Sequence, residues 1–370
     1  MDPFDLIILG GGISGLGVAR EASRRKLRTA LLESGRCASA TSDNTLRIIH
    51  GGFRYLQNFD FPRVIKSLGD QKAVLRDAPD AVAPLPCVMP LQRFGLKSRL
   101  PVTCAALLYR CIMRLCGSPL PRPRVMSASE VHREIPLLRG LAPHGALLWH
   151  DAVMLEPSKV TESLLREIAQ GPVTILEGVK AASVAVADGL YEVRAQDGRA
   201  FQARSVVSTL GPFMSSVAVP EQLAGARPLW CKGFNITLSR QLEARYGVGI
   251  EGETGRLFFV VPRGSGSAIG TWYTAHPNDG SPVIPFDEEV EALISEFNAA
   301  LPGANVHRSE VTGFDAGLLP MEGESASGPA LVANTQIHAV GRYVEVLSTK
   351  YTTFRSQARQ ALAKASKGLV

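Results

Sequence analysis

The chain has 370 residues, 45% of them hydrophobic and 20% charged, a composition that describes a folded protein large enough for two lobes. Its net charge of +6 is moderate and no aromatic-rich module accompanies it, so we expect no nucleic-acid partner. The six cysteines form no C-x-x-C pair, which favours ordinary buried thiols over disulfides or a metal site. We find no signal peptide and no apolar run of the roughly 18 residues that span a membrane, so we expect a cytoplasmic location.

The first 35 residues follow the order strand, glycine loop, helix, strand and acid. Gly10, Gly12 and Gly15 have G-x-G-x-x-G spacing after an apolar run, and a second apolar run ends at Glu33. The glycines allow a tight turn, close approach of a pyrophosphate and close packing of the helix on the strand. Glu33 is placed to accept hydrogen bonds from a ribose. The pattern therefore predicts a bound dinucleotide, either FAD or NAD(H).

A polar loop follows Glu33 and is rich in Ser, Thr and Gly, with His50, Arg54 and Tyr55 close together near its end. A loop of this length directly after a nucleotide-binding strand is more often functional than structural. We expect a helix over residues 62–80 after it.

Residues 95–124 differ in character from the rest of the chain. A helix is predicted over 103–116, with Arg110 and Arg114 on one face, and four further basic residues flank it. One interpretation is an interfacial helix that contacts a membrane headgroup layer. The other is a helix packed on the second lobe with two exposed arginines.

The second half of the chain alternates short strands with helices. We expect helices over 154–169, 287–301 and 352–365, short strands over 173–212, an antiparallel sheet over 230–275 and a last strand over 343–349. The nucleotide lobe is then discontinuous, because its first strands are N-terminal and its last strand is C-terminal. This arrangement favours FAD over NAD(H).

The predicted fold is α/β, with a discontinuous Rossmann-type FAD-binding lobe and an inserted α+β substrate lobe that holds an antiparallel sheet. We assign residues 1–75, 148–222 and 312–370 to the FAD-binding lobe, and residues 76–147 and 223–311 to the substrate lobe.

Several segments resemble the FAD-dependent glycerol-3-phosphate dehydrogenases, within the superfamily of D-amino-acid oxidase and glycine oxidase. The resemblance is carried by DLIILGGGISG, LLESG, IIHGGFRYLQ, VVSTLGPF, CKGFNITL, AIGTWYT and STKYTTFR. It covers nearly the whole chain but lacks the helical C-terminal domain of many members. Because the superfamily shares one fold, the fold alone does not fix the substrate.

The resemblance implies FAD as the cofactor and assigns roles to individual residues. Implied cofactor contacts are Gly10, Gly12, Ile13, Ser14, Gly15, Glu33, Ser34, Thr41, Ser42, Arg47, His50, Gly51, Val179, Thr209, Gly211, Lys350, Tyr351 and Thr352. Implied catalytic positions are Arg54, His50, Lys350, Asn235 and Tyr273. Arg54 would hold the substrate oxygen, Lys350 would stabilise charge on the reduced flavin, and His50 would accept a proton or order the flavin loop.

Other positions depart from the family pattern. Asn235 stands where the family has a histidine, and an amide cannot take a proton at neutral pH. Leu319 replaces one phosphate-binding arginine, and a second arginine falls in the apolar segment 330–334. A Thr-Asp pair has become Trp272 and Tyr273. These changes predict a less anionic, bulkier alcohol or amine resting on Trp272 or Tyr273, in place of glycerol 3-phosphate.

Alternatives to this interpretation stay open. Arg263 or Arg342 could supply the phosphate contact, which would leave an authentic glycerol-3-phosphate dehydrogenase with a relocated phosphate site. An amino-acid or amine oxidase shares the same fold, and the missing histidine also allows a flavin-binding protein without turnover. The electron acceptor would be oxygen or a quinone.

Overall fold

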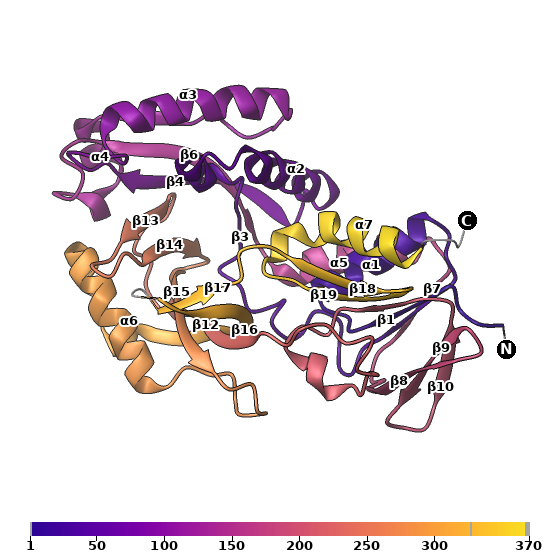
Figure 1. Cartoon of the computed structure of the whole chain (residues 1–370). Helices are drawn as coiled ribbons and strands as arrows, with labels where there is room; N and C mark the ends of the chain where they lie inside the picture. Colours follow the sequence, from indigo (N-terminus) through magenta and orange to yellow (C-terminus); the bar gives the residue numbers. More distant parts are fainter. Residues whose placement is uncertain (1, 326–327, 367–370) are drawn as a thin grey trace.

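The computed structural model describes residues 2–325 and 328–366. A six-stranded sheet has the order β18-β19-β11-β1-β2-β7, and all its pairs are parallel except β18 with β19 (Figure 1). Its strands are β1 (Leu6–Leu9), β2 (Thr29–Leu32), β7 (Val173–Leu176), β11 (Val206–Ser208), β18 (Gln336–Val340) and β19 (Tyr343–Leu347). Its strands come from both ends of the chain, as predicted for a discontinuous nucleotide lobe.

The four central strands of this sheet, β19, β11, β1 and β2, are short and buried on both faces. Leu6 and Ile8 face a core formed with α1 (Ile13–Arg24), α5 (Pro157–Ile168) and α7 (Phe354–Ala365). Ile7 and Leu9 face the three-stranded sheet on the other side. That sheet consists of β8 (Ala181–Ala187), β9 (Leu190–Ala195) and β10 (Ala200–Ala203). Continuous apolar runs are the pattern expected for parallel strands covered on both sides.

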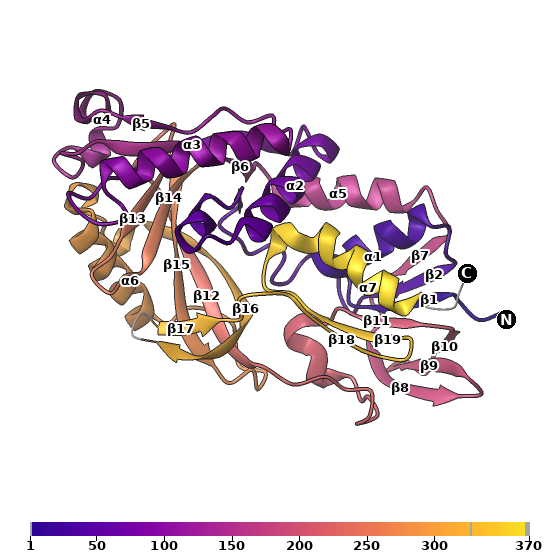
Figure 2. The ribbon, with the colours of Figure 1, turned by 45° about the horizontal axis from the view of Figure 1, so that its top comes forward.

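A ten-stranded, mostly antiparallel sheet forms the other half of the molecule, with α3 (Arg99–Leu115) along its outer side (Figure 2). Its strands are β3 (Ile48–Ile49), β4 (Val82–Pro90), β5 (Arg124–Met126), β6 (Ala146–Met154), β12 (Leu229–Leu238), β13 (Gly247–Glu251), β14 (Leu257–Arg263), β15 (Gly266–His276), β16 (Val311–Ser325) and β17 (Gly328–Leu331). Three further helices are α2 (Phe61–Asp77), α4 (Ala128–Glu134) and α6 (Asp287–Ala300).

Most helices and strands lie where the sequence predicts them, but several of their first or last residues differ from the prediction. The helix expected over 154–169 begins only at Pro157, because the preceding residues continue β6. The helix expected over 103–116 begins at Arg99, since a proline is tolerated within the first turn. The strands β4 and β6 were not expected. The lobe boundaries stay a prediction, although β3, β6, β16 and β17 join the ten-stranded sheet from segments assigned to the FAD-binding lobe.

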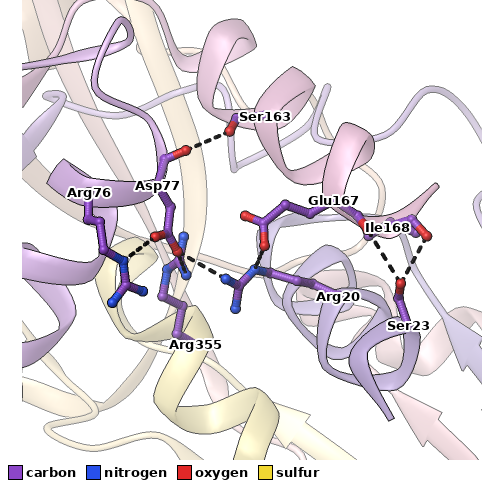
Figure 3. Close-up of polar contacts among 8 residues, drawn as sticks. All are labelled: Arg20, Ser23, Arg76, Asp77, Ser163, Glu167, Ile168 and Arg355. Carbon is purple, nitrogen blue, oxygen red and sulfur yellow. Dashed lines mark hydrogen bonds and ion pairs between the residues drawn. The ribbon is translucent and has the colours of Figure 1, made fainter. Parts of the chain in front are cut away.

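An ion-pair network with a buried centre at Asp77, Arg20 and Arg355 links the helices over the six-stranded sheet (Figure 3). The Asp77 carboxylate at the end of α2 accepts from Arg20 at 3.0 Å, from Arg76 at 2.6 Å and from Arg355. Arg20 also donates to Glu167 of α5 at 2.7 Å. Burial opposes ionisation, but the Arg76 hydrogen bond and the arginine charges hold the pKa of Asp77 below its usual range. We call these five residues the Asp77 cluster; it joins α1, α2, α5 and α7.

The cysteines are all free thiols, but not all of them are buried as expected. Cys104 and Cys111 are exposed, because they lie on the outward face of α3. No group of three or more His, Cys, Asp and Glu side chains in residues 2–325 and 328–366 is placed to hold a metal ion. In the same part of the chain, no helix is both long and apolar enough to cross a membrane.

Candidate flavin and substrate site

The glycine loop between β1 and α1 leaves a helix N-terminus open to a ligand. Gly10 has φ +91°, a conformation that favours glycine, and a Cβ there would lie 2.9 Å from the Thr209 carbonyl oxygen. Gly12 is the N-cap residue of α1 and supplies no capping side chain. Free N–H groups and the positive end of the helix dipole are suited to a phosphate group.

Gly15 is needed for packing within the protein. A Cβ on Gly15 would overlap the Gly10 carbonyl oxygen and would lie 2.8 Å from Thr209 Oγ1. The absence of a side chain at this position lets α1 pack against the end of β1. This is the packing role that the glycine spacing predicts for the third glycine.

Glu33 lies at the end of β2 beside this loop. Its carboxylate accepts from the Gly11 N–H at 2.6 Å and from the Gly35 N–H at 2.8 Å. Ser42 reaches back from the polar loop, and its hydroxyl accepts from the Ile13 N–H at 3.0 Å. The acid and the polar loop are therefore held at the mouth of the glycine turn.

A cavity of about 570 Å³ runs from the glycine loop to the strands of the ten-stranded sheet. The cofactor residues expected from the sequence that line it are Gly10, Gly12, Ile13, Ser14, Glu33, Ser34, Thr41, Ser42, Val179, Thr209, Gly211, Lys350 and Tyr351. Asn235 and Tyr273 line its far end. One continuous cavity thus joins residues that lie more than 300 positions apart in the chain.

Six expected site residues do not line this cavity: Gly15, Arg47, His50, Gly51, Arg54 and Thr352. The Arg47 guanidinium donates to the Leu155 carbonyl oxygen at 3.1 Å, and burial followed by the Arg263 charge lowers its pKa. Thr352 lies in the short turn between β19 and α7. Their assigned contacts with the cofactor stay predictions.

Lys350 brings a positive charge to the cavity from the end of β19. Its ammonium group donates to the Tyr55 hydroxyl and lies 4.5 Å from the centre of the Tyr55 ring. Tyr55 also carries the Arg63 guanidinium 4.9 Å from its ring centre. Arg54 is exposed on the short helix η1 (Phe53–Asn58), which also carries Tyr55, and its charge lies near enough to Tyr273 to affect that hydroxyl.

The far end of the cavity is mainly apolar and aromatic. A Cβ on Gly233 would lie 3.0 Å from the Tyr273 ring and 3.1 Å from the Leu319 side chain, so both side chains lie over this glycine. Trp230 and Leu318 complete the lining at this end. Burial raises the pKa of the Tyr273 hydroxyl, although a Thr271 hydrogen bond and the Arg54 charge oppose the shift. The hydroxyl is protonated at neutral pH and can donate a hydrogen bond.

Asn235 is buried beside Tyr273 but is occupied by its neighbours. Its Oδ1 accepts from the Thr271 hydroxyl at 2.9 Å, and a Cβ on Gly270 would overlap the same oxygen. The Asn235 side-chain oxygen is thus engaged within the protein, and its amide group supplies no base.

Of the two aromatic residues expected to support the substrate, Tyr273 lines the cavity and Trp272 does not. Successive residues of a strand point to opposite faces, so Trp272 packs in the core behind the sheet. Its ring lies 6.5 Å from Phe258 and 3.8 Å from the Arg256 guanidinium.

Neither of the two alternative phosphate-binding arginines lines the cavity in the described part of the chain. Arg263 pairs with Asp315 and donates to the Thr45 carbonyl oxygen at 3.2 Å. Arg342 lies in the turn between β18 and β19. The cavity wall at Leu319 therefore receives no cation from either residue.

The comparisons with known proteins agree with this architecture. Residues 5–342 match the family described as FAD dependent oxidoreductase. The chain belongs to this family. An aerobic glycerol-3-phosphate dehydrogenase of Staphylococcus aureus (strain USA300) is 24% identical over 388 residues, which covers 100% of this chain and 68% of that protein. The resemblance to glycerol-3-phosphate dehydrogenases and the choice of FAD over NAD(H) are confirmed.

Two solved structures share the fold. A glycerol-3-phosphate dehydrogenase from Bacillus halodurans, complexed with FAD, has a TM-score of 0.72 at 21% identity and covers 100% of this chain. This chain spans 65% of that one. A glycine oxidase from Geobacillus kaustophilus has a TM-score of 0.70 at 16% identity, with 99% of this chain and 95% of that chain covered.

FAD is the cofactor of the family, and the cavity fits it. Gly12 leaves the phosphate end free of a side chain, and Glu33 places carboxylate acceptors beside the loop. Lys350 places a cation further along the cavity, where a reduced flavin would carry negative charge. An open helix N-terminus, a carboxylate that can accept from a ribose and a cation thus line one cavity, a combination that fits FAD.

Proposed function

We propose that this protein oxidises a small or medium, non-phosphorylated substrate at a carbinol carbon. The observation that supports this best is Leu319, which lies with Tyr273 at the far end of the cavity where a phosphate-binding arginine was expected. A charge-assisted hydrogen bond contributes about 1.5–3 kcal/mol, so a site that lacks two of them binds a phosphate group weakly.

We assign the chemical roles to the following residues. Bound FAD supplies the acceptor, flavin N5, for the hydride that leaves the carbinol carbon. Arg54 and His50 do not line the cavity, but the Arg54 charge acts on Tyr273, which does. In this proposal Arg54 holds the substrate oxygen, and the protonated Tyr273 hydroxyl can donate a second hydrogen bond to it. His50 accepts the hydroxyl proton, and Lys350 balances negative charge in the cavity after the hydride has left.

Anaerobic reduction of the flavin tests this proposal. The holoprotein is mixed with glycerol 3-phosphate, neutral alcohols, 2-hydroxy acids and amino acids in separate cuvettes, and the flavin absorbance is followed. Bleaching by a neutral alcohol or hydroxy acid supports the proposal. Bleaching by glycerol 3-phosphate alone would favour an authentic dehydrogenase with a relocated phosphate site. Bleaching by amino acids, with ammonia release, would favour an amine oxidase.

A flavin that dithionite reduces but no substrate reduces would favour a binding protein without turnover. The electron acceptor is tested on the same reduced protein, where oxygen would yield hydrogen peroxide and a quinone analogue would be reduced directly. We propose one of these two acceptors.

We also propose a cytoplasmic protein that contacts a membrane surface through residues 95–124. The α3 helix is apolar on two sides, because Val102 and Tyr109 are buried while Leu100, Leu107 and Leu115 are 75%, 53% and 88% exposed. The outward residues, here called the outer stripe, are Leu100, Cys104, Leu107, Cys111 and Leu115. At about 100° per residue they fall within an arc of about 80°.

The charge of this region favours an anionic lipid surface over a second copy of the chain. Residues 81–129 hold seven lysines and arginines and no aspartate or glutamate. The net charge of this segment therefore exceeds the net charge of +6 of the whole chain. Arg110 and Arg114 lie along one side of the outer stripe and are exposed. Two copies would bring like charges together, whereas anionic headgroups attract each basic residue by about 1 kcal/mol.

Vesicle co-sedimentation tests the membrane contact. The protein should sediment with vesicles that contain phosphatidylglycerol, less with pure phosphatidylcholine, and less again at high salt. Leu107→Gln and the double variant Arg110→Gln/Arg114→Gln should reduce binding. Val186→Gln, which alters an exposed apolar residue on β8, is the matched control and should not. Absence of sedimentation, or a concentration-dependent dimer in its place, would contradict the proposal.

A further inference from the structure

Asp151 of β6 is a buried carboxylate that is not among the residues predicted from the sequence. Its side chain is 2% exposed. One oxygen accepts from the Gly51 N–H at 2.7 Å and from Gln71 at 3.5 Å. The other accepts from His50 Nδ1 at 2.8 Å and from Trp149 Nε1 at 3.1 Å. Of these four donors, only His50 can change its protonation state.

This arrangement determines which nitrogen of His50 carries the proton. An ionised carboxylate only accepts hydrogen bonds, so Nδ1 holds the hydrogen and Nε2 keeps its lone pair. The His50 side chain is 51% exposed, and its ring lies 5.5 Å from that of Phe259. Asp151 and Phe259 therefore fix the ring on two sides and leave it accessible on a third.

The same carboxylate holds the turn that leads to Arg54. The Gly51 N–H bonds to Asp151, and a Cβ on Gly51 would overlap the Tyr109 hydroxyl. Gly52 follows with φ +90°, and the short helix η1 (Phe53–Asn58) carries Arg54 from there. Asp151 thus sets the position of the candidate base and of the segment that carries the oxygen-binding cation.

We propose that Asp151 is a positioning residue that fixes the tautomer and orientation of His50 for proton transfer. The inference rests on the proposed function, in which His50 accepts the substrate proton. The carbinol C–H bond breaks and its hydride passes to FAD, which is reduced. The O–H bond breaks, its proton passes to His50 Nε2, and a C=O bond forms in the oxidised product. Asp151 keeps its hydrogen bond to His50 Nδ1 throughout and faces the imidazolium that forms.

Other titratable groups near Asp151 do not compete in this role. Burial and then the Asp151 charge raise the pKa of Cys87 on β4 and of Tyr109 on α3. Burial lowers the pKa of His150, the preceding residue on β6. Cys87 and Tyr109 stay protonated near neutral pH, but the Asp151 charge also acts on His150. A changed pH profile in an Asp151 variant is therefore assigned to His50 only by comparison with the His50→Asn variant.

The first test needs no substrate. Nitrogen-15 NMR of histidine-labelled holoprotein gives the tautomer of each imidazole, and His50→Asn identifies the His50 signals. The wild type should show a protonated Nδ1 and an unprotonated Nε2. Asp151→Asn should convert the ring to the opposite tautomer or a mixture, because the amide can donate to Nδ1. An unchanged tautomer in Asp151→Asn would overturn the inference, whatever the substrate is.

The second test uses turnover of whichever substrate reduces the flavin. Asp151→Asn should lower kcat by about 10²- to 10⁴-fold with little change in KM, and should move the acidic limb of kcat/KM to lower pH. In the His50→Asn background, Asp151→Asn should not lower kcat further, because both changes remove the same function, proton transfer to His50. Additive losses would overturn the inference.

Trp149→Phe is the matched control, since it removes the other donor to the same oxygen and leaves the His50 pair in place. It should retain activity within a few-fold, and a loss equal to that of Asp151→Asn would assign Asp151 a merely structural role. Flavin content and thermal unfolding establish that each variant is folded. A wild type that oxidises no substrate would defeat the proposed function, while the NMR test would still decide the role of Asp151.

Discussion

Replacing Gly15 by alanine sets two physical effects against each other. Glycine in a helix interior is about 1 kcal/mol less favourable than alanine, so the change should stabilise α1 if space were available. Space is absent, because the new Cβ would overlap the Gly10 carbonyl oxygen and lie 2.8 Å from Thr209 Oγ1. Both obstacles belong to a buried turn that cannot rotate away. We therefore expect Gly15→Ala to be destabilising and to disturb FAD binding.

The magnitude follows from the displacement that relieves the overlap. The start of α1 must move from Gly10 by on the order of 1 Å to restore a carbon–oxygen separation of about 3.5 Å. Overpacking of this kind costs about 1–3 kcal/mol of folding free energy, which exceeds the helix-propensity gain. The displaced N–H groups would also lose contacts to the pyrophosphate. Two lost contacts of about 1.5–3 kcal/mol each weaken FAD binding by roughly 10²- to 10⁴-fold.

Flavin absorbance per protein, FAD titration of the apoprotein and thermal unfolding measure these effects. Gly69→Ala is the matched control, because Gly69 lies inside α2 and nothing lies within 4 Å of its added Cβ. It should bind FAD like the wild type and gain about 0.5–1 kcal/mol of stability. A Gly15→Ala protein with wild-type FAD affinity would refute the reasoning, since α1 would then have found room that the structure does not provide.

Three further predictions follow. Asp77→Asn should lower the free energy of unfolding by about 3–5 kcal/mol at neutral pH, because it removes the carboxylate partner of the buried Arg355 and one of the two carboxylate partners of the buried Arg20. Since the folded pKa of Asp77 is depressed, its contribution is present above about pH 4 and is lost as the pH falls through the folded value; urea unfolding at a series of pH values checks this. Iodoacetamide at about pH 8 should label Cys104 and Cys111 before Cys231, whose pKa burial raises to about 12, as peptide mass spectrometry would show. Leu319→Arg should tighten binding of glycerol 3-phosphate by about 10- to 150-fold in a flavin absorbance titration, and unchanged affinity would place the substrate elsewhere.

The cofactor half of the cavity could be predicted because backbone geometry dictates its residues. Position 10 requires a positive φ, position 12 must leave the helix end uncovered, and position 15 has no room for a Cβ. Each requirement selects glycine, so the three glycines appear at a fixed spacing. The discontinuous lobe was visible for a related reason, since β1 and β19 are short apolar runs covered on both faces. Backbone constraints of this kind act within a few residues and can be read from the sequence.

Asp151 was not predicted, because its role depends on contacts with residues far away in the sequence. Its donors lie 100, 101, 80 and 2 residues away, and only the nearest, Trp149, is local. The signal available was an aspartate inside the apolar run ALLWHDAVM, a buried charge that must find donors. The strand itself was not expected, so the charge was not recognised as buried.

The wall of the cavity at the substrate end is formed by individual side chains, so single substitutions can change it. On an antiparallel strand the side-chain direction alternates, so Tyr273 faces the cavity while Trp272 stabilises the core behind it. The same alternation puts Leu319 beside Tyr273 across Gly233, on a backbone whose register is fixed by pairing with β12. A change at position 319 or 273 therefore alters the cavity wall without altering the fold. This separation would let a chain keep the FAD-binding architecture of its family while its substrate-facing wall changes, as we propose for the wall at Leu319.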